Sequence, residues 1–464
     1  MKTRVEVDPL GEKAIPEEAY CGIQTLRATE NFPVSGIRAP LPFIKAYVMV
    51  KKAAALANTE VGWLDEERKR AIVQACDEIL EGKFLDQFVV DVFQAGAGTS
   101  FNMNVNEVLA NRALEILGKK KGDYKSVGPN DHVNMGQSTN DTFPTATHIA
   151  VLMALQPLLK ELDSLADAFA EQGKKHLKTV KSGRTHLQDA VPVTIGQEFS
   201  AYASALRNAC NQLRERQKNL YSLALGGTAA GTGANAHPKY KRLAIAELGK
   251  MTGFPLKPAA NSFEALQSYR PVQTVSSGLK ELALELIRVA NDLRLLSSGP
   301  TTGLAEIELP AVQPGSSIMP GKVNPVMAEC LDMVAFQVVG NDLTVSFAVQ
   351  AGQMELNVMM PVIMYNMLFS ISILTSYLPV FRKKCVEGIT VNEKRCFQYL
   401  EKNPALATFL SPHIGYLEAA KIAKQALEEG RSVKEIALEK GLFKPEELER
   451  ILDPKRLLNE DGGK

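Results

Sequence analysis

The sequence predicts a mainly α-helical fold built around a central bundle of long helices. Apolar residues recur at alternating spacings of three and four between Val272 and Leu296, which is the pattern of one buried stripe on a long helix. The stretch from Leu356 to Phe381 carries no formal charge, and strand-like alternation is scarce along the chain. Long helices with such faces bury them by packing side by side, within one subunit or across several.

Two further stripes predict two more long helices in the middle of the chain. The first stripe consists of Leu155, Leu158, Leu162, Leu165 and Phe169, and the second of Phe199, Tyr202, Leu206, Ala209, Leu213 and Leu220. Pro271 suits the first turn of the helix over 272–296, and Gly299-Pro300 would end it. Together with the uncharged stretch, these patterns predict four long central helices.

The uncharged stretch is also long enough to span a membrane. It contains polar and helix-breaking residues, among them Asn357, Asn366 and Pro361, and no second stretch of this kind accompanies it. We therefore interpret it as a buried bundle helix and predict no membrane partner. A helix that is apolar all round needs more burial than one small bundle supplies, so we also expect oligomerisation.

Shorter helices with clear end signals flank the central region. Asp65 is a good N-cap, and Gly82 is a good end for the helix that follows it. Ser432 and Glu435 have the spacing of a capping box, and Pro445 would begin the last helix. The change from short helices to long ones and back to short ones predicts an N-terminal mostly helical domain, a central long-helix domain and a small C-terminal helical domain. Their predicted bounds are 1–141, 142–394 and 395–464, with a frayed tail from Pro454.

Composition excludes several classes of function. The 464 residues include 53 Lys and Arg against 52 Asp and Glu, so no overall charge favours nucleic acid or an anionic membrane surface. The six cysteines show no metal-ligand or CxxC spacing, which is typical of free thiols in a reducing compartment. The first residues lack the apolar core of a secretory signal, so we expect a cytoplasmic protein. The sequence shows no metal-ligand cluster and no phosphate-loop or dinucleotide motif, so we also expect no metal and no cofactor.

Four polar runs could contact a ligand: residues 96–100, 134–141, 182–189 and 315–325. The last run places two serines, a lysine and an asparagine between glycines and prolines, which indicates a loop with free amides and hydroxyls. Each run also has a simpler interpretation, as a surface turn, a helix N-cap or a structural histidine loop. The glycine-rich run 226–235 lacks the lysine and context of a phosphate loop, so we interpret it as a packing turn.

Together these runs contain hydroxyls, amides, one histidine and one lysine, with few acids. Such groups suit a small dicarboxylate, because neutral hydrogen-bond donors together with one cation can bind its carboxylates. They do not suit metal-assisted hydrolysis.

The run GSSIMPGKVNP at 315–325 resembles the signature loop of the fumarase/aspartase superfamily. GAGTSFNMNVNEVLAN, QSTND and GRTHLQDAVP resemble the family's other substrate-contacting regions, in the same order, and the resemblance covers nearly the whole chain. It implies three mostly helical domains and a homotetramer in which the central domains of four subunits form one large bundle. It also implies active sites that are shared between subunits.

The resemblance implies a lyase that acts on a small dicarboxylate. Thr139 within QSTND and the segment MVKKAAALAN favour elimination of ammonia from L-aspartate to give fumarate. Gly136, Thr142 and the segment HIGYLEAAKIA favour the alternative, a class II fumarate hydratase that acts on L-malate. Met360 departs from the acid that aspartases usually have there, which leaves the alternative open.

The roles implied by the resemblance fall on eleven residues. Ser316 would be the base that forms an aci-carboxylate intermediate, on a mobile loop, and His186 paired with Glu329 would complete the catalytic set. The implied substrate-binding residues are Thr99, Ser138, Thr139, Asn140, Thr185, Ser317, Lys322 and Asn324. From the residues alone, His186 is the rival base, because its ordinary pKa suits proton transfer near neutral pH.

Two other classes of protein remain as alternatives. A purely structural helical assembly would need no clustered polar loops, and an ultraviolet assay for fumarate would distinguish it. An inactive relative that binds a partner would be expected to have lost Ser316 or Lys322, and both are present.

Overall fold

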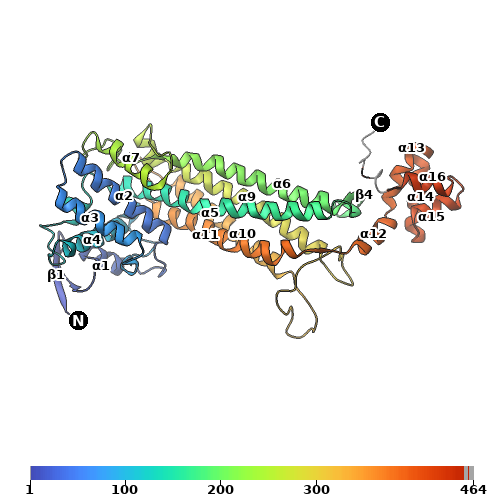
Figure 1. Cartoon of the computed structure of the whole chain (residues 1–464), viewed down its shortest axis with the longest axis horizontal. Helices are drawn as coiled ribbons and strands as arrows, with labels where there is room; N and C mark the ends of the chain where they lie inside the picture. The colour runs from blue at the N-terminus through green and yellow to red at the C-terminus, as the bar shows by residue number, and fades with distance from the viewer. Residues whose placement is uncertain (1, 454–457, 459–464) are drawn as a thin grey trace. The chain divides into compact units, whose positions relative to one another are not determined.

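The computed structural model, which describes residues 2–453 and Leu458, confirms the mainly α-helical class (Figure 1). The predicted frayed tail from Pro454 lies almost wholly outside the described residues. The chain forms two compact units from alternating stretches of sequence. The first unit consists of 1–159, 211–283 and 335–375, and the second of 160–210, 284–334 and 376–464. The predicted domain boundaries near residues 141 and 394 stay a prediction.

Five long helices contribute residues to both units. They are α5 (Thr139–Lys175), α6 (Ile195–Gln217), α9 (Arg270–Leu296), α10 (Val326–Gln350) and α11 (Met360–Lys384). Every residue of the stripes at 155–169 and 272–296 is buried, as the sequence predicts. Their alternating spacing places them on one face of each helix, and that face is withdrawn from water.

Two of these helices differ from their predicted extents. Helix α6 ends at Gln217, so Leu220 of the predicted stripe lies in the short 3-10 helix Lys218–Tyr221. Helix α11 begins only at Met360, because Asn357 Oδ1 accepts the backbone N–H of Met359 at 2.8 Å and turns the chain there.

The sequence patterns miss helix α10 altogether. Its apolar residues are spread around the whole circumference, so no periodic face marks it as a helix. One of its faces stays exposed in the single chain, including Phe336, Leu343 and Phe347. Exposed apolar surface of this extent is typical of a face that another chain covers.

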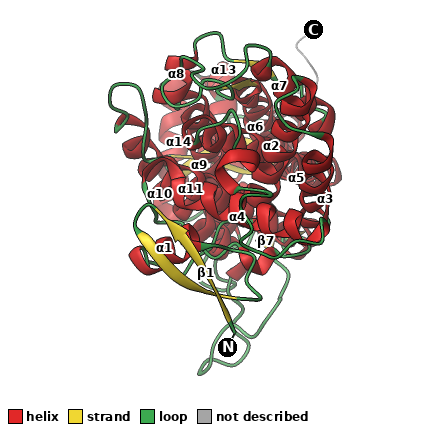
Figure 2. Ribbon diagram, turned by 90° about the vertical axis from the view of Figure 1, so that its left-hand side faces the viewer, coloured by secondary structure: helices red, strands yellow, loops and turns green. Residues whose placement is uncertain are grey.

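Side-chain contacts show which long helices are neighbours within each unit. In the first unit, Ser276 of α9 donates to Asp342 of α10 at 2.7 Å, and Asn341 of α10 donates to Ser370 of α11 at 2.9 Å. In the second unit, Tyr202 of α6 donates to Asp292 of α9 at 3.0 Å. Helices account for most of the view in Figure 2.

The remaining helices and strands of the first unit are shorter than the five long helices. They are β1 (Thr3–Asp8), β2 (Gly11–Pro16), α1 (Ile23–Asn31), α2 (Leu41–Glu60), α3 (Glu66–Leu80), α4 (Thr99–Ile116), β5 (Ser222–Leu223), α7 (Tyr240–Thr252), β6 (Lys257–Pro258) and α8 (Ser262–Gln267). Asp65 caps α3 by accepting the N–H of Arg68, as predicted. Rings of α2, α4 and α5 meet in a core in which Phe43 lies 5.1 Å from Phe101 and 4.8 Å from Phe143.

The second unit adds a hairpin and a group of C-terminal helices. Its elements are β3 (Val180–Thr185), β4 (Gln188–Thr194), β7 (Ile307–Glu308), β8 (Thr390–Val391), α12 (Glu393–Glu401), α13 (Ser411–Ile414), α14 (Tyr416–Glu429), α15 (Val433–Glu439) and α16 (Pro445–Ile451). The predicted capping box of Ser432 and Glu435 is present, and Pro445 begins the last helix.

Among the residues that the structure describes, two helices are long and apolar enough to cross a membrane, Thr139–Lys175 and Met360–Gly388, so the uncharged stretch is not alone, contrary to what the sequence suggested. The most apolar windows of these helices are 78% and 56% buried inside the fold. Core helices of a folded bundle meet the same criterion, so length and composition alone do not indicate a membrane span here.

Candidate functional site

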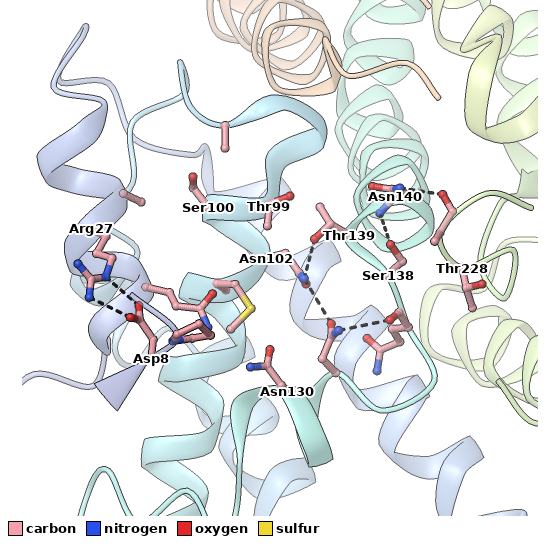
Figure 3. Close-up of a pocket in the computed structure, with 18 of the residues that line it drawn as sticks. Asp8, Arg27, Thr99, Ser100, Asn102, Asn130, Ser138, Thr139, Asn140 and Thr228 are labelled. Atoms are coloured by element: carbon pink, nitrogen blue, oxygen red, sulfur yellow. Dashed lines mark hydrogen bonds and ion pairs between the residues drawn. The ribbon is translucent and has the colours of Figure 1, made fainter. Parts of the chain in front are cut away.

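A pocket of about 880 Å³ opens in the first unit where two helices begin (Figure 3). Four of the predicted substrate-binding residues line it: Thr99, Ser138, Thr139 and Asn140. Thr99 is the first residue of α4 and Thr139 is the first residue of α5. Because the N-terminus of a helix carries partial positive charge and unpaired N–H groups, this arrangement favours an anion.

Local sequence determines how these two helices begin. Gly98 precedes α4 with a left-handed φ of 83°, and a Cβ there would lie 2.1 Å from the ring of Phe143 on α5. Glycine therefore permits the close approach of the two helix starts. At the start of α5, Ser138 Oγ accepts the N–H of Asn140 at 3.2 Å. This contact is the predicted N-cap, and it is compatible with a ligand-binding role.

A buried lysine, Lys51 of α2, lies behind the pocket wall. Its ammonium donates to Asn102 Oδ1 at 2.7 Å, Asn134 Oδ1 at 2.9 Å and Gln137 Oε1 at 2.9 Å. Burial lowers the pKa of Lys51 to about 7. Asn102 in turn donates to Thr139 Oγ1 at 2.8 Å, so the lysine orients a chain of groups that ends at the pocket.

Asp141 is a second fully buried titratable group at this site. It accepts the backbone N–H groups of Ser138 at 3.0 Å and of Gly226 and Thr228 at 2.9 Å each. Burial raises the pKa of Asp141 to about 6, although these three hydrogen bonds act in the opposite direction. The carboxyl group thus attaches the 226–228 turn to the start of α5.

The glycine-rich run therefore does more than the packing that its sequence suggests. Thr228 and Ala229 line the pocket, and Asn140 Nδ2 donates to the carbonyl of Ala229 at 2.8 Å. The run carries no charged side chain, and only its position in the fold reveals this role.

Helix α1 forms another wall of the pocket and contributes an ion pair. Arg27 Nε lies 2.8 Å from Asp8 Oδ2, and Nη2 donates to Asp8 Oδ1 at 2.9 Å. This cation is neutralised by Asp8, and every other polar side chain that lines the pocket carries an amide or a hydroxyl. Sequence analysis did not single out either residue.

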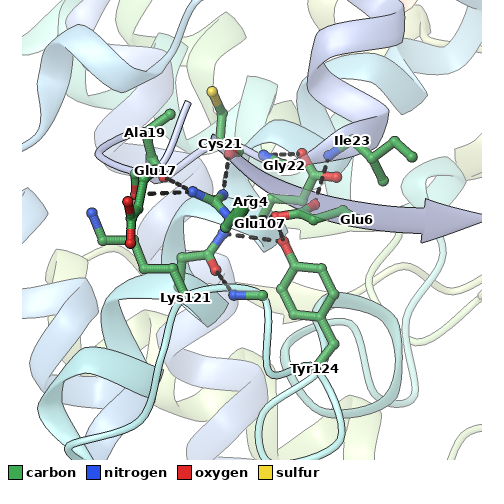
Figure 4. Close-up of polar contacts among 12 residues, drawn as sticks. Arg4, Glu6, Glu17, Ala19, Cys21, Gly22, Ile23, Glu107, Lys121 and Tyr124 are labelled. Atoms are coloured by element: carbon green, nitrogen blue, oxygen red, sulfur yellow. Dashed lines mark hydrogen bonds and ion pairs between the residues drawn. The ribbon is translucent and has the colours of Figure 1, made fainter. Parts of the chain in front are cut away.

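Buried carboxylates hold the N-terminus of α1 in place (Figure 4). Glu107 accepts the backbone N–H groups of Gly22 and Gln24 at 2.8 Å each. Glu6 accepts the N–H of Ile23 at 2.8 Å and the hydroxyl of Tyr124 at 3.0 Å. Negative groups are favourable at this end of a helix, so the pair stabilises the position of the α1 wall.

In the second unit, Thr185 and His186 lie at the exposed tip of the β3–β4 hairpin. The sequence suggests a polar loop here, and the structure instead pairs Thr185 with Gln188 across a two-residue connection. Strand β3 is mostly polar and β4 contains a proline, so neither shows the alternation that would have predicted a strand.

Residues 315–325 form the predicted loop, also in the second unit. Ser316 Oγ accepts the backbone N–H groups of Ile318 at 3.2 Å and Met319 at 3.0 Å. Gly315 N donates to the carbonyl of Lys322 at 2.9 Å, and a Cβ on Gly315 would lie 2.2 Å from that oxygen. The loop base is thus closed tightly, and only glycine fits at 315.

The predicted site residues are therefore divided between the two units. Four of them line the pocket of the first unit. The other seven belong to the second unit: Thr185, His186, Ser316, Ser317, Lys322, Asn324 and Glu329. Ser317 and Lys322 are exposed, while Glu329 is half-buried in the first turn of α10. In the described part of the chain, no three His, Cys, Asp or Glu side chains gather as a metal site.

Comparison with known proteins is consistent with this geometry. Residues 11–340 match the family model described as Lyase, and residues 406–459 match the model described as Fumarase C C-terminus. The aspartate ammonia-lyase of Bacillus subtilis is 51% identical over 97% of this chain and 95% of its own. The class II fumarate hydratase of Thermus thermophilus is 48% identical over the whole of both chains. A solved fumarate lyase:delta crystallin structure from Brucella melitensis is 50% identical with a TM-score of 0.96, covering 98% of this chain and 99% of that chain.

Proposed function

Because this chain belongs to the lyase family of the fumarase/aspartase superfamily, and is therefore an enzyme, we propose that it eliminates ammonia from L-aspartate to give fumarate. The observation that carries the proposal is the pocket where α4 and α5 begin, which presents Thr99, Ser138 and Thr139 beside two helix N-termini. Neutral donors on a positive helix end suit a carboxylate that gains charge during the reaction.

In the proposed mechanism, Ser316 removes a proton from the carbon beside one carboxylate of L-aspartate. The electron pair moves into that carboxylate and forms a doubly charged aci-carboxylate. This intermediate then collapses, the carbon–nitrogen bond on the adjacent carbon breaks, and ammonia leaves with the bonding pair. A free serine is a weak acid, so the two N–H groups that donate to Ser316 Oγ support the role by stabilising an alkoxide.

The other predicted residues have separate roles in this proposal. Thr99, Ser138, Thr139 and Ser317 would hold the carboxylate on which charge develops. Thr185, Lys322 and Asn324 would hold the other carboxylate. Asn140 and His186 would contact the leaving amine, and Glu329 would pair with the histidine and set its tautomer.

L-aspartate is favoured over L-malate mainly because Thr139 within QSTND resembles the aspartases at this position. The Thr139 hydroxyl lies at the pocket, where it accepts from Asn102. We expect purified protein to form fumarate from L-aspartate much faster than from L-malate, followed by ultraviolet absorbance. Ammonia release should equal fumarate formation. Faster conversion of L-malate would make the enzyme a class II fumarate hydratase and overturn the choice of substrate.

The proposal also includes a homotetramer in which neighbouring chains complete each site. The exposed face of α10 supports this assembly, because Phe336, Leu343 and Phe347 are 59%, 59% and 65% exposed and lie at helical spacing around Gly340. A Cβ on Gly340 would meet nothing in this chain, which leaves room for the close approach of another helix.

We therefore expect light scattering to give the mass of a tetramer. Replacing both Phe336 and Phe347 with glutamate should dissociate it and abolish activity, since charges would then face the apolar interface. The matched control is Leu427→Glu on α14, which is 72% exposed and outside this face. A monomer with full activity would contradict the shared site.

A further inference from the structure

Four charged side chains form a cluster beside the β3–β4 hairpin, and two of them, Lys181 and Glu306, are buried. Glu306 is fully buried, and its Oε2 lies 2.8 Å from Lys181 Nζ and accepts from Arg184 Nη1 at 3.0 Å. Arg184 Nη2 lies 2.9 Å from Glu306 Oε1. Lys181 also donates to Glu198 Oε1 at 2.9 Å. The two cations and two anions are balanced, as burial of charge requires.

Glu306 connects two segments that the proposed mechanism uses. On one side it binds Lys181 and Arg184 of β3, and Arg184 directly precedes Thr185 and His186. On the other side it lies directly before β7, in the stretch that leads to the loop at 315–325. Its own backbone is fixed as well, because its carbonyl accepts the N–H of Asn392 at 2.9 Å.

The tip of this hairpin has an unfavourable backbone conformation. His186 and Leu187 have φ angles of 56° and 59°, and they form the two-residue connection between Thr185 and Gln188. Turns with two left-handed residues strongly prefer Asn-Gly, because a Cβ is disfavoured there. Leu187 is also 71% exposed, so packing of its own side chain does not explain the conformation. Strained residues persist only where the surroundings impose their geometry.

We propose that Glu306 is a positioning residue that imposes this geometry and so places Thr185 and His186 for the reaction. Arg184 transmits this effect, because it directly precedes Thr185 and its guanidinium is held by the planar carboxylate of Glu306. The bulge between Ser182 and Arg184 aims this side chain inward, and a Cβ on Gly183 would lie 2.5 Å from the carbonyl of Val191. The inference rests on the proposed function only for the roles of Thr185 and His186.

The test compares Glu306→Gln, which keeps the shape but removes the charge, with the wild-type enzyme. Thr185 would hold a carboxylate in both the ground state and the transition state, so we expect KM to rise at least about tenfold. Hydrogen exchange measured by mass spectrometry should become faster in peptides that cover 180–194. A loss of folded protein alone would lower kcat and leave KM unchanged.

Three variants complete the experiment. Glu198→Gln removes a carboxylate from the same cluster that does not contact Arg184, so it should leave KM and exchange of the hairpin near the wild-type values. Glu306→Asp keeps the charge, so its KM and its hairpin exchange should rise less than those of Glu306→Gln. Leu187→Gly relieves the strain at the tip, so in the Glu306→Gln background it should bring the raised KM most of the way back to the wild-type value. In the wild-type background it should change KM little. If Glu306→Gln does not fold, Arg184→Gln removes the same contact from its half-buried partner.

A Glu306→Gln or Arg184→Gln enzyme with wild-type KM and wild-type hairpin exchange would overturn the proposal. Failure of Leu187→Gly to restore KM would also overturn it, because the strain would then be irrelevant. KM is measured with whichever of L-aspartate and L-malate the wild-type enzyme converts. If it converts neither, the proposed function has failed, and the exchange rates of the hairpin still decide the role of Glu306.

Discussion

Replacing Ser316 with alanine is expected to lower kcat by about 10²- to 10⁴-fold, because the variant loses the hydroxyl that accepts the substrate proton. Binding should change little, since the proton is transferred only in the transition state. The loop should keep its closed base, because Gly315 and Lys322 are joined through backbone atoms that the substitution does not touch. The measurement is kcat and KM for fumarate formation, with succinate binding as an independent measure of the site.

Two companion variants distinguish the base from the groups that bind substrate. Lys322→Ala should raise KM as well as lower kcat, because its ammonium would hold a carboxylate in the ground state too. His186→Ala should lower kcat through poorer departure of the amine. A Ser316→Ala enzyme with near-normal turnover, beside an inactive His186→Ala enzyme, would make the histidine the base.

Replacing Lys51 with methionine is expected to weaken binding of succinate by about tenfold to a hundredfold. The variant removes hydrogen bonds from a charged donor to Asn102, Asn134 and Gln137, each of which contributes about 1.5–3 kcal/mol, and leaves buried oxygens without a partner. Asn102 then no longer has a fixed orientation toward Thr139. The matched control is Lys52→Met, because Lys52 pairs with Asp77 at the partly exposed surface of the same helix.

The pH dependence of this binding follows from the same groups. Lys51 loses its charge as pH rises through about 7, and Asp141 gains a negative charge as pH rises through about 6. Both changes disfavour a dianion, so succinate should bind more weakly at pH 8 than at pH 6. Binding should therefore take up protons near pH 7.5, detected by calorimetry in buffers of different ionisation enthalpy. Lys51→Met should take up fewer than half as many protons as the Lys52→Met control, and equal uptake would contradict this role.

Much of the helical framework was predictable from the sequence, because its signals are local. The three-and-four spacing from Val272 to Leu296 depends only on which side of one helix each residue occupies. Asp65 and Ser432 accept backbone N–H groups three residues away, and Pro445 fixes only its own φ at the start of a helix, so these three helix starts could be predicted without knowing the fold. The loop at 315–325 was predictable for the same reason, since glycine and proline exclude regular structure locally.

The tertiary structure alone decided the features that depend on distant partners. In the sequence, Lys51 cannot be told from a surface lysine. Only folding places three amide oxygens, from α4 and from the 134–137 turn, around its ammonium group. Glu306 and Arg184 are far apart in sequence, and only folding brings their side chains together next to the strained tip of the 180–194 hairpin. Helix α10 has no periodic face to recognise, because its apolar residues are spread around the helix rather than gathered on one side. Periodicity and capping are properties of a short segment, whereas burial and charge pairing belong to the whole fold.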